Sequence, residues 1–197
     1  MYRRYIKRLL GLLLSILGLP IFAILFIIVA PIIVLEDGGP VFYNAPRLGK
    51  DGRVFKMFKF RSMRVNAPDL RNEDGSTYNS ENDPRVTRIG KILRKTSLDE
   101  TPQVLNVLIG NMSCIGPRPD LPGADKEVYR PGDEVKLSVN PGITGYSQAY
   151  FRNSSTMDQR LDGDVYYAKN VSFLLDMKIL LKTIGTVLAH KNIYRND

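Results

Sequence analysis

A long uncharged apolar run near the N-terminus constrains this chain more than any other feature. Residues 9–35 contain no charged side chain, and the cations Arg3, Arg4, Lys7 and Arg8 precede them. At 1.5 Å per residue the run gives roughly 40 Å of helix, enough to cross a hydrocarbon core of about 30 Å. A cleaved signal peptide fits less well, because the run is too long and no small-residue cleavage site follows it. The sequence therefore predicts a membrane-embedded helix over residues 1–36.

The charges on both sides of this run leave its topology open. Residues 47–64 are also basic, with Asp51 as their only acid. By the positive-inside rule both flanks favour the cytoplasm, and a single crossing cannot satisfy both. Pro20 lies in the middle of the run, where it removes a backbone N–H and crowds the carbonyl of Ile16. A helix broken at Pro20 could enter one leaflet and return, whereas the alternative is a spanning helix with a tolerated kink.

Composition limits the chemistry that the rest of the chain can perform. The chain has 28 Lys and Arg against 20 Asp and Glu, a net charge of +8, which indicates a phosphate-bearing partner such as nucleic acid, anionic lipid or a nucleotide. A single cysteine, Cys114, excludes a disulfide framework and Cys-cluster zinc sites. The only histidine, His190, lies near the C-terminus, so a Ser-His or Cys-His mechanism is disfavoured. Chemistry must then depend on carboxylates, cations, hydroxyls or a metal.

Residues 37–197 read as one compact α+β domain with amphipathic helices and a small sheet. Turn-rich segments separate short strand-like runs, and Lys59 and Arg61 share a face if "VFKMFKFRSM" is a strand. Helical spacing appears in the basic "RVTRIGKILRK", in "SLDETPQVLNVLIGN" and in "NVSFLLDMKILLKTIGTVLA". The last of these has an apolar stripe that would pack on the domain or lie along a bilayer, formed by Leu174, Met177, Leu181, Ile184 and Leu188.

Two turn-and-strand segments offer further cations. In "MSCIGPRPD" a short strand leads into a turn where Pro117 and Pro119 hold Arg118 between them, a stiff setting for a phosphate-binding guanidinium. In "NPGITGYSQAYFRN" we expect a turn followed by a strand that ends in Arg152.

Two neighbouring carboxylates in "KTSLDETPQ" allow two readings. Ser97 and Glu100 have the spacing of a capping box, in which the acids only stabilise a helix start. Pro102 argues for a different register, because with Asp99 as N-cap it occupies a position where no N–H is missed. The sequence therefore predicts a helix that begins at Asp99. The acids are then either a cap or part of an anion site.

The functional reading uses the same helix start. A carboxylate kept ionised there could attack phosphorus and form an acyl phosphate, if cations first neutralise the phosphate oxygens. A divalent ion held by Asp99, Glu100 and diphosphate oxygens would suit Mg²⁺. The candidate phosphate-binding cations are Lys59, Arg61, Arg94, Arg118 and Arg152.

The ordered motifs "GPVFYNAPRLGKDGRVFKMFKFRSM", "RIGKILRKTSLDETPQVLNVLIGNMSCIGPRP", "VNPGITGYSQ" and "DVYYAKNVSFLLDMKILLKTI" resemble the bacterial sugar transferase family of monotopic phosphoglycosyl transferases. The resemblance covers nearly the whole chain, and its length is similar to the small PglC-like members. It implies transfer of a sugar 1-phosphate from a UDP-sugar to polyprenyl phosphate, usually undecaprenyl phosphate, with release of UMP. This reaction is the first membrane step of glycan or exopolysaccharide assembly.

The resemblance also assigns roles to residues. It implies that Asp99 is the nucleophile of a two-step mechanism with Mg²⁺, that Glu100 is its partner, and that the N-terminal helix is re-entrant. Phosphate-binding residues are implied at Lys59, Arg94, Arg118 with its neighbour Pro119, and Arg152. Family members commonly have Ser-Pro at the helix break, where this chain has Leu19-Pro20; Ser15 is then a candidate to satisfy the exposed carbonyl.

The implied location is the cytoplasmic face of the bacterial inner membrane. The expected partners are a UDP-sugar, polyprenyl phosphate and the membrane, and the sequence leaves the oligomeric state open, a dimer included. The alternative function is a non-enzymatic membrane-surface scaffold that binds anionic lipid through its basic helices. A nucleic-acid module is disfavoured, because a membrane-anchored chain without a known fold motif is a poor candidate.

Overall fold

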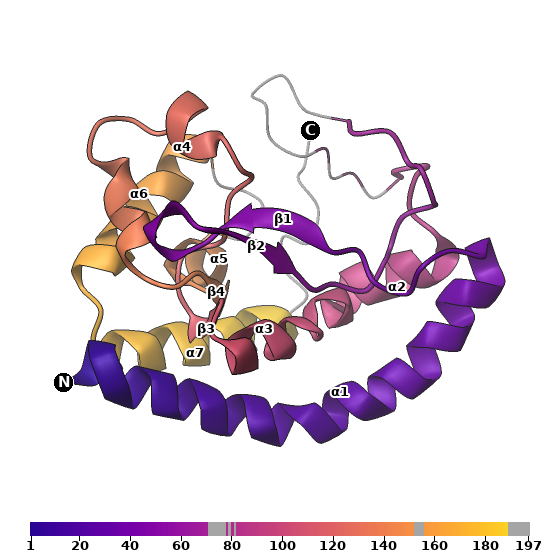
Figure 1. Ribbon diagram of the computed structural model, residues 1–197, viewed down its shortest axis with the longest axis horizontal. Coiled ribbons are helices and arrows are strands. Elements are labelled where there is room, and N and C mark those ends of the chain that lie inside the picture. Colours follow the sequence, from indigo (N-terminus) through magenta and orange to yellow (C-terminus); the bar gives the residue numbers. More distant parts are fainter. Residues whose placement is uncertain (71–77, 79, 81, 152–155, 189–197) are drawn as a thin grey trace.

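The computed structural model describes residues 1–70, 78, 80, 82–151 and 156–188 (Figure 1). In chain order the elements are η1 (Tyr2–Ile6), α1 (Lys7–Asp37), β1 (Ala45–Leu48), η2 (Lys50–Gly52), β2 (Val54–Met57), α2 (Arg88–Thr96), η3 (Leu98–Glu100), α3 (Gln103–Ile109), β3 (Ser113–Ile115), α4 (Ala124–Glu127), η4 (Asp133–Ser138), β4 (Gly142–Thr144), α5 (Tyr146–Tyr150), α6 (Met157–Lys169) and α7 (Phe173–Leu188).

These elements form an α+β fold with small sheets, as predicted from the sequence. Strands β1 and β2 form an antiparallel hairpin in which Ala45 lies opposite Met57. Strands β3 and β4 pair in parallel, with Ser113 opposite Gly142. The predicted strand ending in Arg152 is wrong over its described part, because β4 ends at Thr144 and the chain continues as the helix α5.

Helix α1 is one continuous helix, and both Pro20 and Pro31 lie inside it. Figure 1 shows it as an arc along one edge of the molecule, in contact with α3. The structure therefore has a curve, and no interruption of the helix, where a break at Pro20 was predicted. Its mean hydropathy of 3.0 and its length are sufficient for a membrane span, and only 11% of the most apolar window is buried. The re-entrant topology stays a prediction.

The first turns of α1 bind the domain through their cations. Lys7 forms an ion pair with Asp176 of α7, and the Arg8 guanidinium donates hydrogen bonds to the carbonyl oxygens of Val107 and Leu108 at the end of α3. These carbonyls lie among the last of the helix, where they lack partners within it.

The last turn of α1 is also bound. Glu36 accepts hydrogen bonds from the backbone N–H groups of Arg88 and Ile89, at the start of α2. Asp37 forms an ion pair with Arg61. Both ends of the helix are therefore attached to the same domain.

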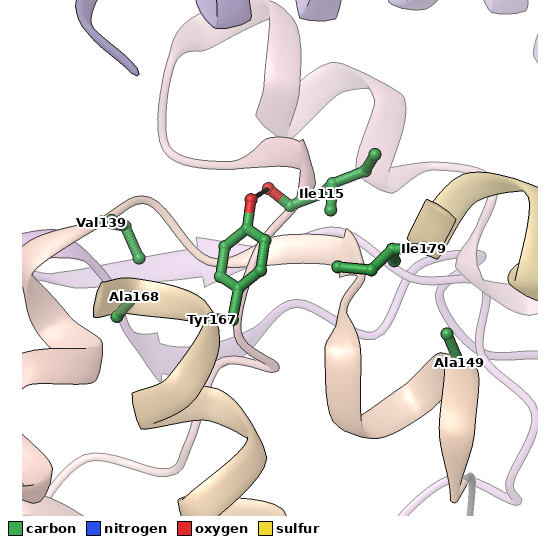
Figure 2. Close-up of a cluster of buried hydrophobic side chains, with 6 residues drawn as sticks. All are labelled: Ile115, Val139, Ala149, Tyr167, Ala168 and Ile179. Carbon is green, nitrogen blue, oxygen red and sulfur yellow. Dashed lines mark hydrogen bonds between the residues drawn. The ribbon is translucent and has the colours of Figure 1, made fainter. Parts of the chain in front are cut away.

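The largest core cluster lies between β3, η4, α5, α6 and α7 (Figure 2). Its buried members are Ile115, Val139, Ala149, Tyr167, Ala168 and Ile179. The Tyr167 hydroxyl is 3.1 Å from the carbonyl oxygen of Ile115 and 2.7 Å from the Asp176 carboxylate. A buried phenol needs such partners, so the core contains a polar centre that joins α6, α7 and β3.

Helix α7 is amphipathic, but the predicted stripe lies on its outer side. Ile179 and Asp176 are buried against the domain, whereas Leu174, Leu181 and Ile184 are exposed. Of the two arrangements left open by the sequence, packing of the stripe on the domain is therefore wrong for these residues. The side chain of Leu188 lies outside the described part of the structure.

Candidate active site

The two adjacent carboxylates lie in a short connection between α2 and α3. Ser97 ends α2 in the left-handed conformation, with φ of 59°, and η3 then forms one 3₁₀ turn that contains Asp99 and Glu100. Helix α3 begins only at Gln103, directly after Pro102. The predicted helix start at Asp99 is therefore wrong. The turn carries the acids instead, and Pro102 stands just before the helix, where its missing N–H costs nothing.

Neither capping arrangement is formed. No side-chain cap bond is made at the start of η3 or of α3, so Ser97 and Glu100 do not make a capping box and Asp99 does not cap α3. The carboxylates bind cations from other parts of the chain.

Lys59 is the centre of this ionic cluster. Its Nζ lies 2.9 Å from Asp99 Oδ2 and 3.1 Å from Glu100 Oε1. Arg118 adds a second cation, with Nη2 3.3 Å from Glu100 Oε1. The Asp99 side chain is 5% exposed, whereas that of Arg118 is 42% exposed, so the cluster extends from a buried acid to an accessible guanidinium.

The neighbouring acids have opposite pKa shifts. Burial raises the pKa of Asp99, and attraction by Lys59 offsets this only in part. Burial also opposes ionisation of Glu100, but Lys59 and Arg118 together outweigh it and lower its pKa to about 2. The pKa of Lys59 is raised, because its two carboxylates outweigh the effect of burial. Glu100 is thus the firmly ionised member of the pair, and Asp99 the more basic one.

Arg94 acts on the same cluster from α2. Its Nε donates to Ser62 Oγ at 3.0 Å, and its charge lowers the pKa of Asp99, although less than Lys59 does. Ser62 was not among the predicted site residues, because it bears no charge and lies among cations in the sequence.

The structure places Arg61 away from this cluster. Its guanidinium binds Asp37 and the carbonyl oxygen of Pro40, at the end of α1. Lys59 and Arg61 were expected to share a strand face, but β2 ends at Met57, so the alternation does not extend to them. Arg152, the remaining predicted cation, lies outside the described residues.

Backbone contacts fix the segment that carries Lys59. Phe60 N–H donates to the carbonyl oxygen of Asp99 at 2.9 Å. Asn106 of α3, fully buried, accepts from Phe58 N–H and donates to the carbonyl oxygen of Lys56, both at 2.8 Å. Sequence reasoning missed Asn106. The sequence feature that could have indicated it is a single amide within the apolar run "VLNVLIG", since a buried amide needs hydrogen-bond partners.

Arg118 projects from a turn that packs backbone against backbone. Gly142 N–H donates to the carbonyl oxygen of Pro117 at 2.9 Å. A Cβ at Gly116 would come within 2.4 Å of the carbonyl oxygen of Asn140, so only glycine allows this approach. The chain just before Arg118 is therefore packed closely against the segment that leads into β4.

The donor set suits a hard divalent ion with few protein ligands. Asp99 and Glu100 provide carboxylate oxygens, and no cluster of three or more His, Cys, Asp or Glu suitable for a metal occurs among the described residues. Mg²⁺ is commonly held by one or two carboxylates together with phosphate oxygens and water, so the pair fits it.

Comparison with known proteins gives one family. A family model described as bacterial sugar transferase matches residues 2–190. The chain is 42% identical over 191 residues to "Galactosyl transferase CpsE" of Streptococcus agalactiae, covering 92% of this chain and 42% of that protein. It is 39% identical over 192 residues to the "UDP-N-acetylgalactosamine-undecaprenyl-phosphate N-acetylgalactosaminephosphotransferase" of Aeromonas hydrophila, covering 94% and 44%.

A third relative has a length closer to that of this chain. The "Exopolysaccharide production protein ExoY" of Sinorhizobium fredii is 38% identical over 199 residues, covering 95% of this chain and 88% of that protein. The chain therefore spans less than half the length of the first two relatives and most of the third.

Proposed function

The chain belongs to the bacterial sugar transferase family, and from this premise we propose that it transfers a sugar 1-phosphate from a UDP-sugar to polyprenyl phosphate, such as undecaprenyl phosphate, and releases UMP. The observation that carries the proposal is the ionic cluster of Asp99, Glu100, Lys59 and Arg118. It combines a nucleophile of raised pKa with cations that can receive diphosphate oxygens.

In the first step the Asp99 carboxylate attacks the phosphorus next to the sugar. The bond to the UMP oxygen breaks, UMP leaves with its electron pair, and an aspartyl phosphosugar remains. Burial raises the pKa of Asp99 and makes it the more basic carboxylate, while Lys59 favours its ionised form. Arg118, which is partly exposed, binds the diphosphate oxygens while Glu100 orients both cations.

In the second step an oxygen of polyprenyl phosphate attacks the same phosphorus. The acyl phosphate bond breaks, the sugar is carried on a polyprenyl diphosphate, and Asp99 is restored as a carboxylate. Mg²⁺ is the proposed cofactor, held by Asp99 and Glu100, and it supplies charge neutralisation of the diphosphate when bound. We place this reaction at the cytoplasmic face of the bacterial inner membrane.

The attachment of α1 supports a re-entrant topology as part of this proposal. Its first turn is bound through Lys7 and Arg8, and its last through Glu36, all to the same domain. A helix whose two ends bind one domain does not place them on opposite sides of a bilayer. Leu17 and Ile21, near the middle of the arc, are exposed and would face lipid.

The test is release of UMP and trapping of the intermediate. With a UDP-sugar and no lipid acceptor, intact-protein mass spectrometry should detect one phosphosugar on the wild type and none on Asp99→Asn. Asp158→Asn is the matched control, since this acid on α6 is 75% exposed. A panel of UDP-galactose, UDP-N-acetylgalactosamine and UDP-glucose would identify the sugar. Turnover by Asp99→Asn would refute the assignment of Asp99 as the nucleophile. Lipid binding without UMP release from any UDP-sugar would favour the alternative function, a membrane-surface scaffold.

A further inference from the structure

A second buried ionic cluster lies next to the turn that carries Arg118. At its centre Lys136 of η4, 3% exposed, lies between two carboxylates: its Nζ is 2.6 Å from Asp120 Oδ2 and 2.8 Å from Asp164 Oδ2. The Tyr129 hydroxyl donates to the same oxygen of Asp120 at 2.7 Å. The reaction steps described above use none of these groups.

Asp120 connects this cluster to the candidate active site. It lies two residues after Arg118 in the same turn, separated from it only by Pro119. Its backbone oxygen accepts a hydrogen bond from Leu48 N–H of β1 at 2.8 Å. A hollow with a volume of about 10 Å³, room for about one water molecule, is bordered by Arg118 and by three members of the second cluster, Asp120, Tyr129 and Lys136.

Such a cluster is a poor source of stability, because burying the three charges costs most of what their attraction returns. We expect the cluster instead to hold the Asp120 side chain in one position. If Asp120 rotated away, Lys136 would keep Asp164 but lose one of its two carboxylates, and the Tyr129 hydroxyl would lose its acceptor, so both contacts hold the Asp120 side chain in place. The prolines on both sides of Arg118 restrict the backbone torsions of this turn, so a fixed Asp120 also fixes the backbone position of Arg118.

We propose that Asp120, held by Lys136 and Tyr129, is a positioning residue that fixes the Arg118 turn for diphosphate binding. The inference rests on the proposed phosphosugar transfer. Asp120 touches no reacting atom in this role, since it acts through the backbone it shares with Arg118.

The decisive measurement is a double-mutant cycle between Asp120→Asn and Arg118→Met. Asp120→Asn alone should lower kcat/KM for the UDP-sugar by about tenfold to a hundredfold, the cost of misplacing a binding group. In the Arg118→Met background, Asp120→Asn should lower kcat/KM by less than about twofold, because the guanidinium that Asp120 positions is already absent. Losses that multiply would show that Asp120 acts independently of Arg118 and would overturn the inference.

A second, less disruptive pair of variants tests the inference even if Asp120→Asn fails to fold. Tyr129→Phe removes a hydroxyl 2.7 Å from the Asp120 carboxylate. Tyr167→Phe removes one at the same distance from Asp176, which is paired with another lysine, the half-buried Lys7. Both should lower Tm. Only Tyr129→Phe should lower kcat/KM, and it should do so non-additively with Arg118→Met.

Hydrogen exchange reports on the turn without any turnover. The Leu48 and Gly142 amides, bonded to Asp120 and Pro117, should exchange faster in Tyr129→Phe and Asp120→Asn than in Tyr167→Phe. Unchanged protection would overturn the inference whether or not the chain is a transferase. Absence of UMP release by the wild type would refute the proposed function alone.

Discussion

At the scale of single residues, Asp99 and Glu100 are neighbours with opposite effects on folding. Because the folded-state pKa of Asp99 is raised, its ionised form at pH 7 costs stability. Glu100 has its pKa lowered from 4.5 to about 2, so it contributes stability that is present above pH 4.5 and is lost as the pH falls towards 2. Replacing each acid should therefore change the free energy of unfolding differently, even though both acids are expected to be needed for activity.

We predict that Asp99→Asn leaves Tm unchanged or raises it, whereas Glu100→Gln lowers the free energy of unfolding by roughly 2–3 kcal/mol. Both should lose nearly all turnover. Thermal unfolding followed by circular dichroism at pH 7 measures the difference. An Asp99→Asn variant less stable than Glu100→Gln would contradict the assignment of the pKa shifts.

Activity should also depend on the ionisation of Asp99. The nucleophile must be ionised, so kcat/KM should fall as the pH decreases through its raised pKa, above the ordinary value of 3.8. Lys59 lowers that pKa, so Lys59→Met should move the acidic limb to higher pH in the residual activity. Lys56→Met, an exposed lysine on β2, is the control and should leave the profile unchanged. An acidic limb at the same pH in Lys59→Met would exclude Asp99 as the titrating group.

The sequence identified these residues better than it predicted their local structure. Lys59, Glu100 and Arg118, all predicted from the sequence, do meet in the ionic cluster, although they are far apart in the chain. Helix periodicity did not reveal the 3₁₀ turn, because Ser97 in the left-handed conformation stops α2 before Pro102 can join a helix. Arg61 lies beyond the end of β2 and binds Asp37 at the end of α1, a long-range contact that the local sequence pattern does not reveal.

At the scale of elements, the packing of α1 on α3 depends on two glycines. A Cβ at Gly18 would lie 3.5 Å from Val104, and one at Gly11 would lie 3.6 Å from Val107, both ordinary contact distances. Alanine therefore fits at these positions, but larger side chains do not. Since α3 begins at Gln103, three residues after Glu100, the α1–α3 contact also supports the candidate site.

We predict that Gly18→Ala stabilises the protein by up to about 1 kcal/mol through helix propensity, whereas Gly18→Leu destabilises it and lowers turnover by separating α1 from α3. Gly185→Leu on α7 is the matched control, because a Cβ there meets no atom within 4 Å. Unfolding and UMP release in detergent would measure both effects. Equal tolerance of leucine at both glycines would exclude tight packing of α1 on α3.

Elements with strong periodicity were predicted, and those with weak periodicity were not. The helices α2 and α7 were found by their spacing, and β3 by its position before a proline turn. Helix α6 was missed, since few of its positions are apolar, although Thr156 and Gln159 form a capping box at its start. At Pro20 the expected help from Ser15 is absent, since Ser15 makes no hydrogen bond to a backbone carbonyl among the described residues.

At the scale of the whole molecule, the apolar run has basic residues on both sides, and a single crossing cannot place both flanks in the cytoplasm. The contacts of α1 bear on this conflict, because they attach both ends of the helix to one domain. Sequence alone could not show that these flanks are tethered, because Lys7 and Asp176 are far apart in the chain and meet only through the fold. In the proposed re-entrant topology both ends of α1 stay on one domain, and the positive charges on its two flanks lie on the same side of the membrane. Helix α7 adds further exposed apolar residues, such as Leu174.

We therefore predict that the N-terminus and the domain are accessible from the same side of the membrane. Cys114 is the only cysteine, so a Cys114→Ala background accepts single probes at Tyr5 and Asp158, which are both exposed. A membrane-impermeant maleimide should label both in inside-out vesicles and neither in intact spheroplasts. A probe at Leu17, which is exposed, should resist the reagent from either side until detergent is added, because in the proposed topology this part of the arc faces lipid. Labelling of Tyr5→Cys from outside and Asp158→Cys from inside would establish a spanning helix. It would also require the Lys7–Asp176 and Arg8 contacts to be absent in the membrane.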